Sequence, residues 1–312
     1  PMTNTYWPAS SSVTPRYAGP VSFFRLPTLS DPALADIALL GLPYDGGTTN
    51  RSGARHGPRD LRAMSMFIRP FHHVTKTSPY TAQRVADFGD VPMNPIDIAA
   101  SLGLIADHYA GFKAVNTRPI TAGGDHLITL PILRALAKDG PVGLIQFDAH
   151  SDTNDSYFGG QKYTHGTWVR RAIEEGLIDP HRCVQIGIRG TRYAPDGNDF
   201  ADAAGVTTIC IEDVHALGVP GVIAEARRIA GTGPTYLSFD IDGIDPAFAP
   251  GTGTPEVGGF SVFEAQQMVR GLKGLTLIGA DVVEVSPPFD PSGNTALVGA
   301  TMMFEILCAL AG

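Results

Sequence analysis

Short apolar runs alternate with segments of helical periodicity along the whole chain. The apolar runs predict eight strands, which cover residues 37–42, 84–88, 119–122, 142–147, 183–188, 207–211, 235–239 and 277–283. The segments between them predict helices over residues 58–67, 96–115, 128–138, 166–176, 219–229, 261–272 and 296–310. Strands that alternate with helices indicate a parallel sheet with helices on both faces, so the predicted fold class is α/β.

No linker, internal repeat or change of composition divides the chain. We therefore expect a single domain over residues 1–312, in which the Pro- and Ser-containing residues 1–35 wrap the surface. No apolar run has the length of a membrane span, so no membrane partner is expected.

Ligand-type side chains follow the run 142–147, which is apolar apart from Gln146. Asp148, His150 and Asp152 stand two residues apart, and residues at i, i+2 and i+4 of a strand share one face. Two acids and an imidazole would then converge at the end of a buried strand. Unpaired buried carboxylates are costly, so a cation is expected to hold them.

Two further apolar runs end in the same way. Asp240 and Asp242 follow the run 235–239, and His126 follows the run 119–122. Ligands of open parallel sheets bind beyond the carboxyl ends of the strands, where all these residues lie. Four carboxylates and two imidazoles suit hard, octahedral ions such as Mn²⁺, whereas structural zinc would need a closed tetrahedral set with Cys or more His. The sequence thus predicts a two-metal hydrolase, against the alternative of acids that cap helices or pair with Arg.

Two more residues are candidates for chemistry. His165 lies in a polar loop ahead of a predicted helix; it is either a proton shuttle or a loop histidine without a role. Glu284 ends the last apolar strand; it could hold a guanidinium through two parallel hydrogen bonds, or pair with an Arg of this chain.

Charge and composition limit the kinds of molecule that this chain is expected to bind and the compartment in which it is expected to work. The formal net charge of −8 disfavours a nucleic-acid partner, which needs a basic surface, and mildly favours a cationic small molecule. No basic segment followed by an apolar one opens the chain, and the cysteines are few and odd in number, as in a reduced cytoplasmic protein: Cys183, Cys210 and Cys308.

Four segments resemble the signatures of the ureohydrolase family, which includes arginase, agmatinase, guanidinobutyrase and guanidinopropionase. They are GGDH at 123–126, DAHSD at 148–152, HGT at 165–167 and SFDIDGIDP at 238–246. The resemblance runs from about residue 18 to the end, in order and spacing. It implies a three-layer α/β/α arginase-type fold with an eight-stranded parallel sheet, two Mn²⁺ ions per chain, and a homo-oligomer, expected to be a hexamer built as a trimer of dimers.

The resemblance also implies roles for residues. His126, Asp148, Asp152 and Asp240 would reach one metal or both, and His150 and Asp242 the second. His165 matches the family's proton-shuttling His, and Glu284 its guanidinium-binding Glu. The expected catalytic residues are therefore His165, Glu284 and Asp152.

The expected reaction splits a guanidino compound into urea and an amine. Within the family the chain resembles the bacterial guanidinopropionases and guanidinobutyrases more than arginase, so 3-guanidinopropanoate is the favoured substrate. Its far end is expected to meet Asn154 and Tyr157. Trp168 and residues 160–163 depart from that pattern.

These departures keep several alternatives open. One is guanidinobutyrase or agmatinase activity, and another is hydrolysis of guanidine or biguanides, for which Ni²⁺ is the alternative metal. An alternative of another class is a non-catalytic, metal-binding subunit of a hetero-oligomer.

Overall fold

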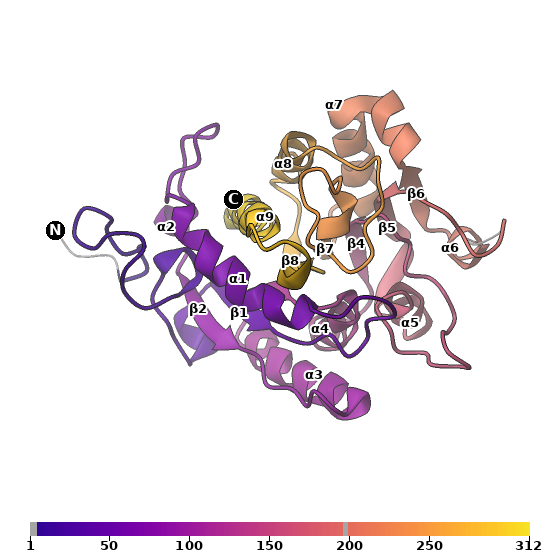
Figure 1. Ribbon diagram of the computed structural model, residues 1–312, viewed down its shortest axis with the longest axis horizontal. Coiled ribbons are helices and arrows are strands. Elements are labelled where there is room, and N and C mark those ends of the chain that lie inside the picture. Colours follow the sequence, from indigo (N-terminus) through magenta and orange to yellow (C-terminus); the bar gives the residue numbers. More distant parts are fainter. Residues whose placement is uncertain (1–4, 196–198) are drawn as a thin grey trace.

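One eight-stranded sheet organises the protein. The computed structural model describes residues 5–195 and 199–312, and its strands lie in the order β2-β1-β3-β8-β7-β4-β5-β6 (Figure 1). Every neighbouring pair is parallel. The strands are β1 (Ile37–Leu42), β2 (Val85–Asp90), β3 (Arg118–Gly123), β4 (Val142–Phe147), β5 (Ile178–Ile188), β6 (Thr207–Cys210), β7 (Thr235–Asp240) and β8 (Leu277–Val283). The predicted α/β fold with an eight-stranded parallel sheet is confirmed.

Helices cover both faces of the sheet. Side chains alternate along each strand, so Leu39 of β1 joins a core with α1, α7, α8 and α9, whereas Leu40 joins a second core with α3, α4 and α5. The helices are α1 (Gly57–Met64), α2 (Pro79–Ala82), α3 (Ile98–Ala114), α4 (Thr129–Leu136), α5 (Trp168–Glu174), α6 (Asp199–Ala204), α7 (Ile211–Ala230), α8 (Val262–Arg270) and α9 (Asn294–Ala311). Two cores, one on each face, make the three-layer arrangement that the sequence implied.

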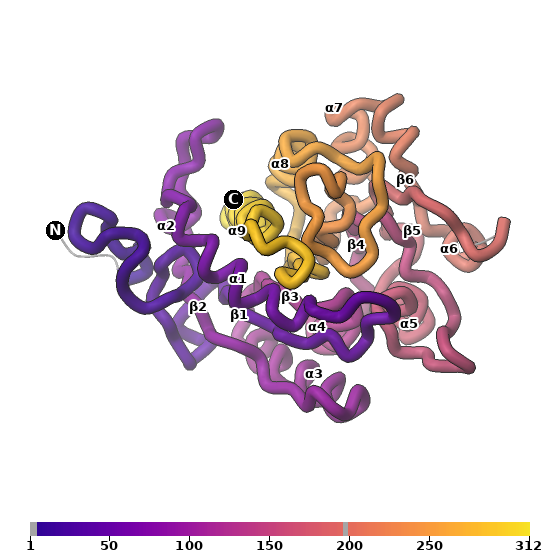
Figure 2. The backbone as a smooth tube through the Cα atoms, viewed as in Figure 1, coloured from indigo at the N-terminus to yellow at the C-terminus, as the bar shows by residue number. Residues whose placement is uncertain are grey.

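The chain does not cross the sheet in sequence order. In Figure 2 the yellow helix α9 and the orange helix α8 lie between the indigo N-terminal segment at the left and the salmon elements β6 and α6 at the right. The strand order gives the reason, because β8 and β7 are inserted between β3 and β4. The ends of β3, β8, β7 and β4 are therefore neighbours, although they are far apart in the sequence.

Three strands occupy the residues that the sequence predicted, namely β1, β4 and β8, and most other elements differ by a few residues. Helix α7 differs most, since it begins at Ile211 rather than at residue 219. Gly218, with a φ of 66°, and Pro220 kink it and interrupt its helical pattern in the sequence. Strand β5 begins at Ile178, in a polar stretch that the apolar pattern could not mark as a strand. The short helices α2 and α6 were not predicted.

The segment before β1 contributes to the core. Phe23 and Phe24 are buried against elements of the α9 face. The Phe23 N–H donates to the Asp87 carboxylate over 2.8 Å, and Thr28 forms a parallel bridge with Asp87. This segment thus covers edge strand β2.

Helix α9 has the length and apolar composition of a membrane span, the only such helix among the described residues. However, 78% of that stretch is buried inside the protein. It packs against α1, α8 and β8 and is a core helix of this fold.

Candidate metal centre and active site

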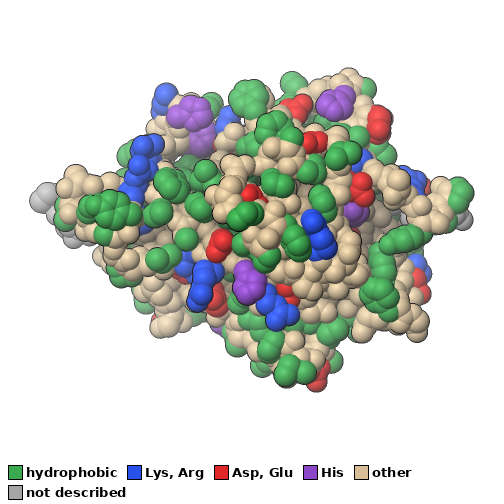
Figure 3. Space-filling view, in the orientation of Figure 1, with side chains coloured by type: hydrophobic (Ala, Val, Ile, Leu, Met, Phe, Trp, Pro, Cys, Tyr) green, Lys and Arg blue, Asp and Glu red, His purple; other side chains and the backbone are tan. Residues whose placement is uncertain are grey.

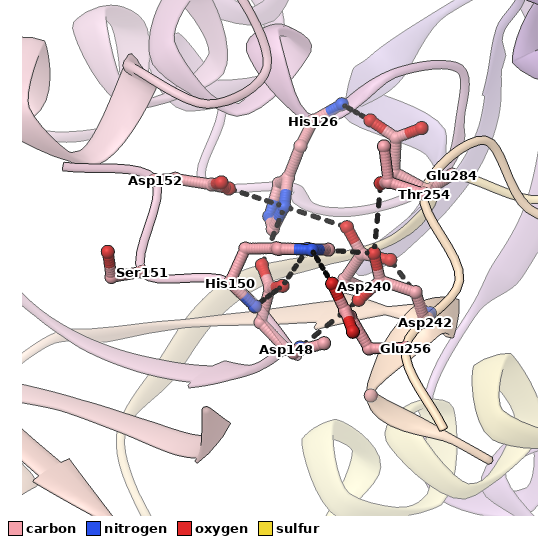
Figure 4. A network of polar contacts seen from close by, with 12 residues as sticks. His126, Asp148, His150, Ser151, Asp152, Asp240, Asp242, Thr254, Glu256 and Glu284 are labelled. Carbon is pink, nitrogen blue, oxygen red and sulfur yellow. Dashed lines mark hydrogen bonds and ion pairs between the residues drawn. The ribbon is translucent and has the colours of Figure 1, made fainter. Parts of the chain in front are cut away.

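Six ligand-type side chains meet at the carboxyl ends of three strands, of which β7 and β4 are adjacent and β3 is separated from β7 by β8. Asp148 follows the last residue of β4, Asp240 ends β7, and His126 follows β3 at the start of a 3₁₀ turn. Figure 4 shows the side chains pointing toward one another from these separate elements. The predicted convergence is present in the structure, but the alternation of a strand does not produce it, because β4 ends at Phe147 and Asp152 has a φ of 54°.

The first ligand group surrounds His126. Its Nδ1 lies 3.1 Å from a carboxylate oxygen of each of three residues, Asp148, Asp152 and Asp240. None of these approaches has hydrogen-bond geometry, so this buried nitrogen has no hydrogen-bond partner among the described residues. A ring nitrogen aimed between three oxygens is the arrangement that a metal ion requires.

The second ligand group surrounds His150. Its Nδ1 lies 3.0 Å from Asp242 Oδ2 and 3.5 Å from Asp148 Oδ1. The two oxygens of Asp148 therefore face different histidines, and Asp148 belongs to both groups. A carboxylate shared in this way is suited to bridge two cations.

Four acids this close, and this deeply buried, repel one another. Burial, and then the charge of Asp148, raises the pKa of Asp152 to about 6. Burial, and then Asp242, raises the pKa of Asp240 well above its ordinary value. Burial also acts to raise the pKa of Asp148, but the His126 and His150 imidazoles hold it below its usual range. Positive charge between these groups would relieve the repulsion, and the donor set fits two hard divalent cations.

Buried donors outside the ligand set orient the carboxylates. Trp168 Nε1 donates to Asp152 Oδ2 over 2.8 Å, and Gln146 Nε2 donates to Asp148 Oδ2 over 2.7 Å. Gln185 in turn donates to Gln146 Oε1 over 2.8 Å. We had not assigned these residues to the site. Two signals could have found them, since Gln146 interrupts an apolar strand and Trp168 departs from the pattern of the resembling enzymes.

His165 and Glu284 form a buried pair beside the ligand groups. His165 Nδ1 lies 2.8 Å from Glu284 Oε1, and that oxygen also accepts the His126 N–H over 2.8 Å. His165 Nε2 lies 2.8 Å from Thr49 Oγ1. The structure thus brings together the two residues predicted for chemistry, and Glu284 forms no ion pair with an Arg among the described residues. Thr49 was missed because the sequence gives no sign that its loop reaches His165.

The protonation of His165 is set by opposing influences. Burial lowers its pKa, but the Glu284 carboxylate and, after it, Asp125 and Asp152 raise it to about 9. The Thr49 N–H lies 3.2 Å from Nε2. Because an amide N–H can only donate, this contact favours an unprotonated Nε2. Thr49 can meet Nε2 in either form, because its hydroxyl oxygen can accept from a protonated Nε2 and its N–H can donate to an unprotonated one.

The loop after β1 is clamped over the site. Asp125 accepts the Gly47 N–H over 2.6 Å, and Gly47 accepts the His165 N–H over 2.9 Å. Gly124 allows the approach, since a Cβ there would overlap the carbonyl oxygen of Tyr44. Backbone contacts thereby fix the position of His165.

Two site residues have unusual backbone conformations. Asp152 has a φ of 54° and Glu284 a φ of 64°, in the left-handed region that residues other than Gly rarely adopt. Such conformations cost about 1–3 kcal/mol each and persist where the surrounding structure enforces them. Here they turn the two carboxylates toward the ligand groups, consistent with a functional site.

A cavity of about 500 Å³ opens onto these groups. Tyr157 and Asn154 line it, as predicted for the far end of a substrate, and the Asn154 amide donates to the Tyr157 hydroxyl oxygen over 2.9 Å. A Cβ on Gly166 would meet that hydroxyl, so the Tyr157 side chain lies directly over the residue after His165. Arg192 also lines the cavity and was not anticipated.

On the face of the molecule shown in Figure 3, Lys and Arg side chains are scattered among acidic and hydrophobic ones. The prediction that nucleic acid is not a partner rests on the net charge of −8.

Comparisons with known proteins identify one protein family. The Arginase family model matches residues 35–309. The chain is 59% identical to guanidinopropionase of Pseudomonas aeruginosa, with 97% of this chain and 96% of that protein covered. It is 46% identical to guanidinobutyrase of the same organism, with 99% and 98% covered. The solved structure of proclavaminate amidinohydrolase from Streptomyces clavuligerus aligns with a TM-score of 0.92 at 39% identity, covering 96% of this chain and 99% of that one.

Proposed function

The chain belongs to the arginase family, and on that premise we propose that it hydrolyses 3-guanidinopropanoate to urea and the corresponding amine. In this reaction water replaces the amine on the guanidinium carbon: guanidinium and water give urea and an alkylammonium ion. The observation that carries the proposal is the pair of ligand groups sharing Asp148, which lies beside the His165–Glu284 pair in one cavity.

The six ligand residues would hold two divalent cations. His126, Asp148, Asp152 and Asp240 would hold one, and His150 and Asp242 would share Asp148 around the other. When bound, such ions supply a water-derived nucleophile at neutral pH and offset the charge of the carboxylates. We propose Mn²⁺ because carboxylates dominate the set, with Ni²⁺ as the alternative.

Glu284 would hold the guanidinium of the substrate. Its Oε1 already accepts two hydrogen bonds, whereas Oε2 accepts none from the described residues. We therefore assign the charge-assisted hydrogen bond with the guanidinium mainly to Oε2, rather than to both oxygens in parallel. Burial of Glu284, which is 1% exposed, strengthens such a bond.

His165 would move the proton that the leaving amine requires. Its Nε2 borders the cavity next to Thr49, which can bond to this nitrogen with or without a proton. A proton taken up at Nε2 is stabilised by the Glu284 carboxylate at Nδ1. Asp152, whose Oδ2 accepts the Trp168 indole N–H, would accept a proton from water, and we include it in the catalytic set.

Tyr157 would select the acid end of the substrate. Asn154 donates to its oxygen, so the hydroxyl proton is directed elsewhere and is free to meet a carboxylate. Burial, and then Asp152, raises the pKa of Tyr157 to about 12, which keeps that proton in place. Asn154 thus positions Tyr157. The side-chain amide of Asn154 already donates to the Tyr157 hydroxyl oxygen, so we do not assign it a hydrogen bond to the substrate.

A screen of urea release tests the proposed function. We expect kcat/KM to be highest for short ω-guanidino acids, followed by guanidine-type compounds, agmatine and finally arginine, measured with Mn²⁺ and Ni²⁺ separately. Arginine is expected last, because its α-amino group would be buried without a partner. Arginine in first place would contradict this reading of the cavity. Urea release from none of the compounds would favour the non-catalytic subunit.

A variant tests the reason for that ranking. Tyr157→Phe is expected to lower kcat/KM for 3-guanidinopropanoate about 10- to 100-fold, because a hydrogen bond to a charged group contributes about 1.5–3 kcal/mol. Activity on guanidine, which has no carboxylate, should change little. Tyr193→Phe, which removes the hydroxyl of another tyrosine lining the cavity, serves as the matched control. Equal losses on both substrates would exclude carboxylate recognition by Tyr157.

The remaining expectations rest on the family resemblance. We propose that the chain, as a single domain, forms a cytoplasmic homohexamer. Light scattering of the purified protein at micromolar concentration tests the oligomer, and a monomer would exclude it.

A further inference from the structure

A completely buried carboxylate lies behind the ligand groups, outside the six ligands. Asp281 of β8 is 0% exposed. Its Oδ1 accepts from Ser238 Oγ over 2.7 Å, and its Oδ2 accepts from the hydroxyls of Tyr236 and Thr129 over 2.9 and 2.7 Å. No Lys or Arg among the described residues pairs with it. Because a buried carboxylate without a cationic partner is costly, Asp281 calls for a functional explanation.

Ser238 connects this carboxylate to a ligand histidine. The Ser238 hydroxyl has one proton, and a carboxylate can only accept, so that proton goes to Asp281. Ser238 Oγ also lies 2.7 Å from His126 Nε2. The serine oxygen must act as the acceptor in this second bond, and His126 must therefore be protonated at Nε2.

The consequence appears at the other nitrogen of the ring. A neutral imidazole has one N–H and one lone pair, so a proton on Nε2 leaves the lone pair on Nδ1. That nitrogen lies 3.1 Å from oxygens of Asp148, Asp152 and Asp240 without forming a hydrogen bond. A lone pair facing three carboxylates is unfavourable until a cation lies between them.

We propose that Asp281 is a positioning residue: through Ser238 it holds His126 in the Nε2–H tautomer and so prepares Nδ1 to bind a divalent cation. The proposal rests on the metal centre proposed above and goes beyond it, since neither Asp281 nor Ser238 is one of the six ligands. We call Asp281 and Ser238 together the tautomer relay. The tautomer relay determines which nitrogen of His126 carries the proton, and it does not change the net charge of the ring.

The two ligand histidines differ in this respect. His150 is 33% exposed, and its Nε2 lies 3.9 Å from Glu256 Oε1, too far for a direct hydrogen bond. The tautomer relay thus serves only the cation held by His126, and its loss should weaken one of the two sites.

Metal binding by three variants tests the tautomer relay. Ser238→Ala removes the acceptor for His126, and Asp281→Asn keeps the shape but adds an amide that can donate to Ser238. Tyr236→Phe is the matched control, because it removes a hydrogen bond to Asp281 from the same strand but not the path to His126. Each protein is freed of metal by a chelator and titrated with Mn²⁺ against a chelating dye. Elemental analysis and electron paramagnetic resonance then report how many ions are bound and whether they form a coupled pair.

We expect two tightly bound Mn²⁺ in the wild-type protein and in Tyr236→Phe, with the signal of a coupled pair. In Ser238→Ala and Asp281→Asn one ion should bind about 10- to 100-fold more weakly, the range for lost partners of metal-ligating histidines. At limiting Mn²⁺ the spectrum should then be that of isolated ions. Thermal unfolding in the presence of chelator checks that each variant folds; if Ser238→Ala does not, Asp281→Asn carries the test.

Two results would overturn the tautomer relay. One is wild-type affinity at both sites in the folded relay variants. The other is a loss in Tyr236→Phe as large as in the relay variants, which would make the effect one of packing around Asp281. Absence of Mn²⁺ and Ni²⁺ binding by the wild-type protein is a different outcome, because it would also remove the proposed function.

Discussion

Replacing Asp148 by asparagine is expected to abolish urea release while leaving the fold largely intact. The two oxygens of Asp148 face different ligand groups, 3.1 Å from His126 Nδ1 and 3.5 Å from His150 Nδ1. One substitution therefore removes charge from both metal positions at once. Because metal-ion catalysis is worth several kcal/mol and each 1.36 kcal/mol is tenfold in rate, we expect a loss of about 10³-fold or more.

The measurement combines urea release, metal content by elemental analysis and circular dichroism. Asp155→Asn is the matched control, since Asp155 is 49% exposed, pairs with Arg171 and lies outside the cavity lining. A surface substitution of this kind should leave the rate within about twofold. Full activity of Asp148→Asn, or loss of activity in Asp155→Asn as well, would contradict the assignment of Asp148 as the shared ligand.

The second large effect is expected at His165. His165→Ala should lower kcat by about 10²- to 10⁴-fold, the usual contribution of general acid–base catalysis. His165 contacts Glu284 and Thr49 and none of the six ligands directly, so metal content should not change. Single-turnover urea release and elemental analysis of the same preparation would measure both quantities.

A milder variant distinguishes the role of the His165 imidazole from the role of the loop that contacts it. Thr49→Val removes only the hydroxyl contact at His165 Nε2, and its effect on kcat should stay within about tenfold, the range of one hydrogen bond. If His165→Ala instead lost metal, or kept the wild-type rate, His165 would be a structural residue. A loss in Thr49→Val as large as in His165→Ala would mean that the loop, rather than the imidazole, limits the reaction.

The local sequence determined much of the fold. The strands β1, β4 and β8 lie at the predicted residues because each is a largely apolar run with sharp ends, as expected of strands buried on both faces. The sequence also placed Asp148, His150 and Asp152 just after a strand end, since the position after an apolar run is a local property. The family motifs then added roles for His165 and Glu284 that spacing alone left open.

The local hydrophobic pattern did not predict two features: the part of helix α7 before its interruption, and the polar beginning of strand β5. Helix α7 was predicted from residue 219, because Gly218 and Pro220 are breakers in any local reading. In the protein the helix is indeed interrupted at Gly218, whose backbone is not helical, and its second half covers the predicted residues. What the pattern missed is the first half, which also packs into the core. The beginning of β5 was missed for a related reason: Ile178 pairs with Val142 of β4, and the sequence around Ile178 does not encode that partner.

Only the tertiary structure decided which residues support the site. Strand order brings β8 beside β7, so that Asp281 can meet Ser238 and, through it, His126. The loop after β1 likewise places Thr49 against His165, 116 residues away in the chain. The sequence could mark the six ligand-type residues because they stand at or just after the ends of β3, β4 and β7, and a local apolar pattern reveals where these strands end. The partners that orient them depend on which strands become neighbours, and that choice is made by hydrogen bonding and packing between distant segments.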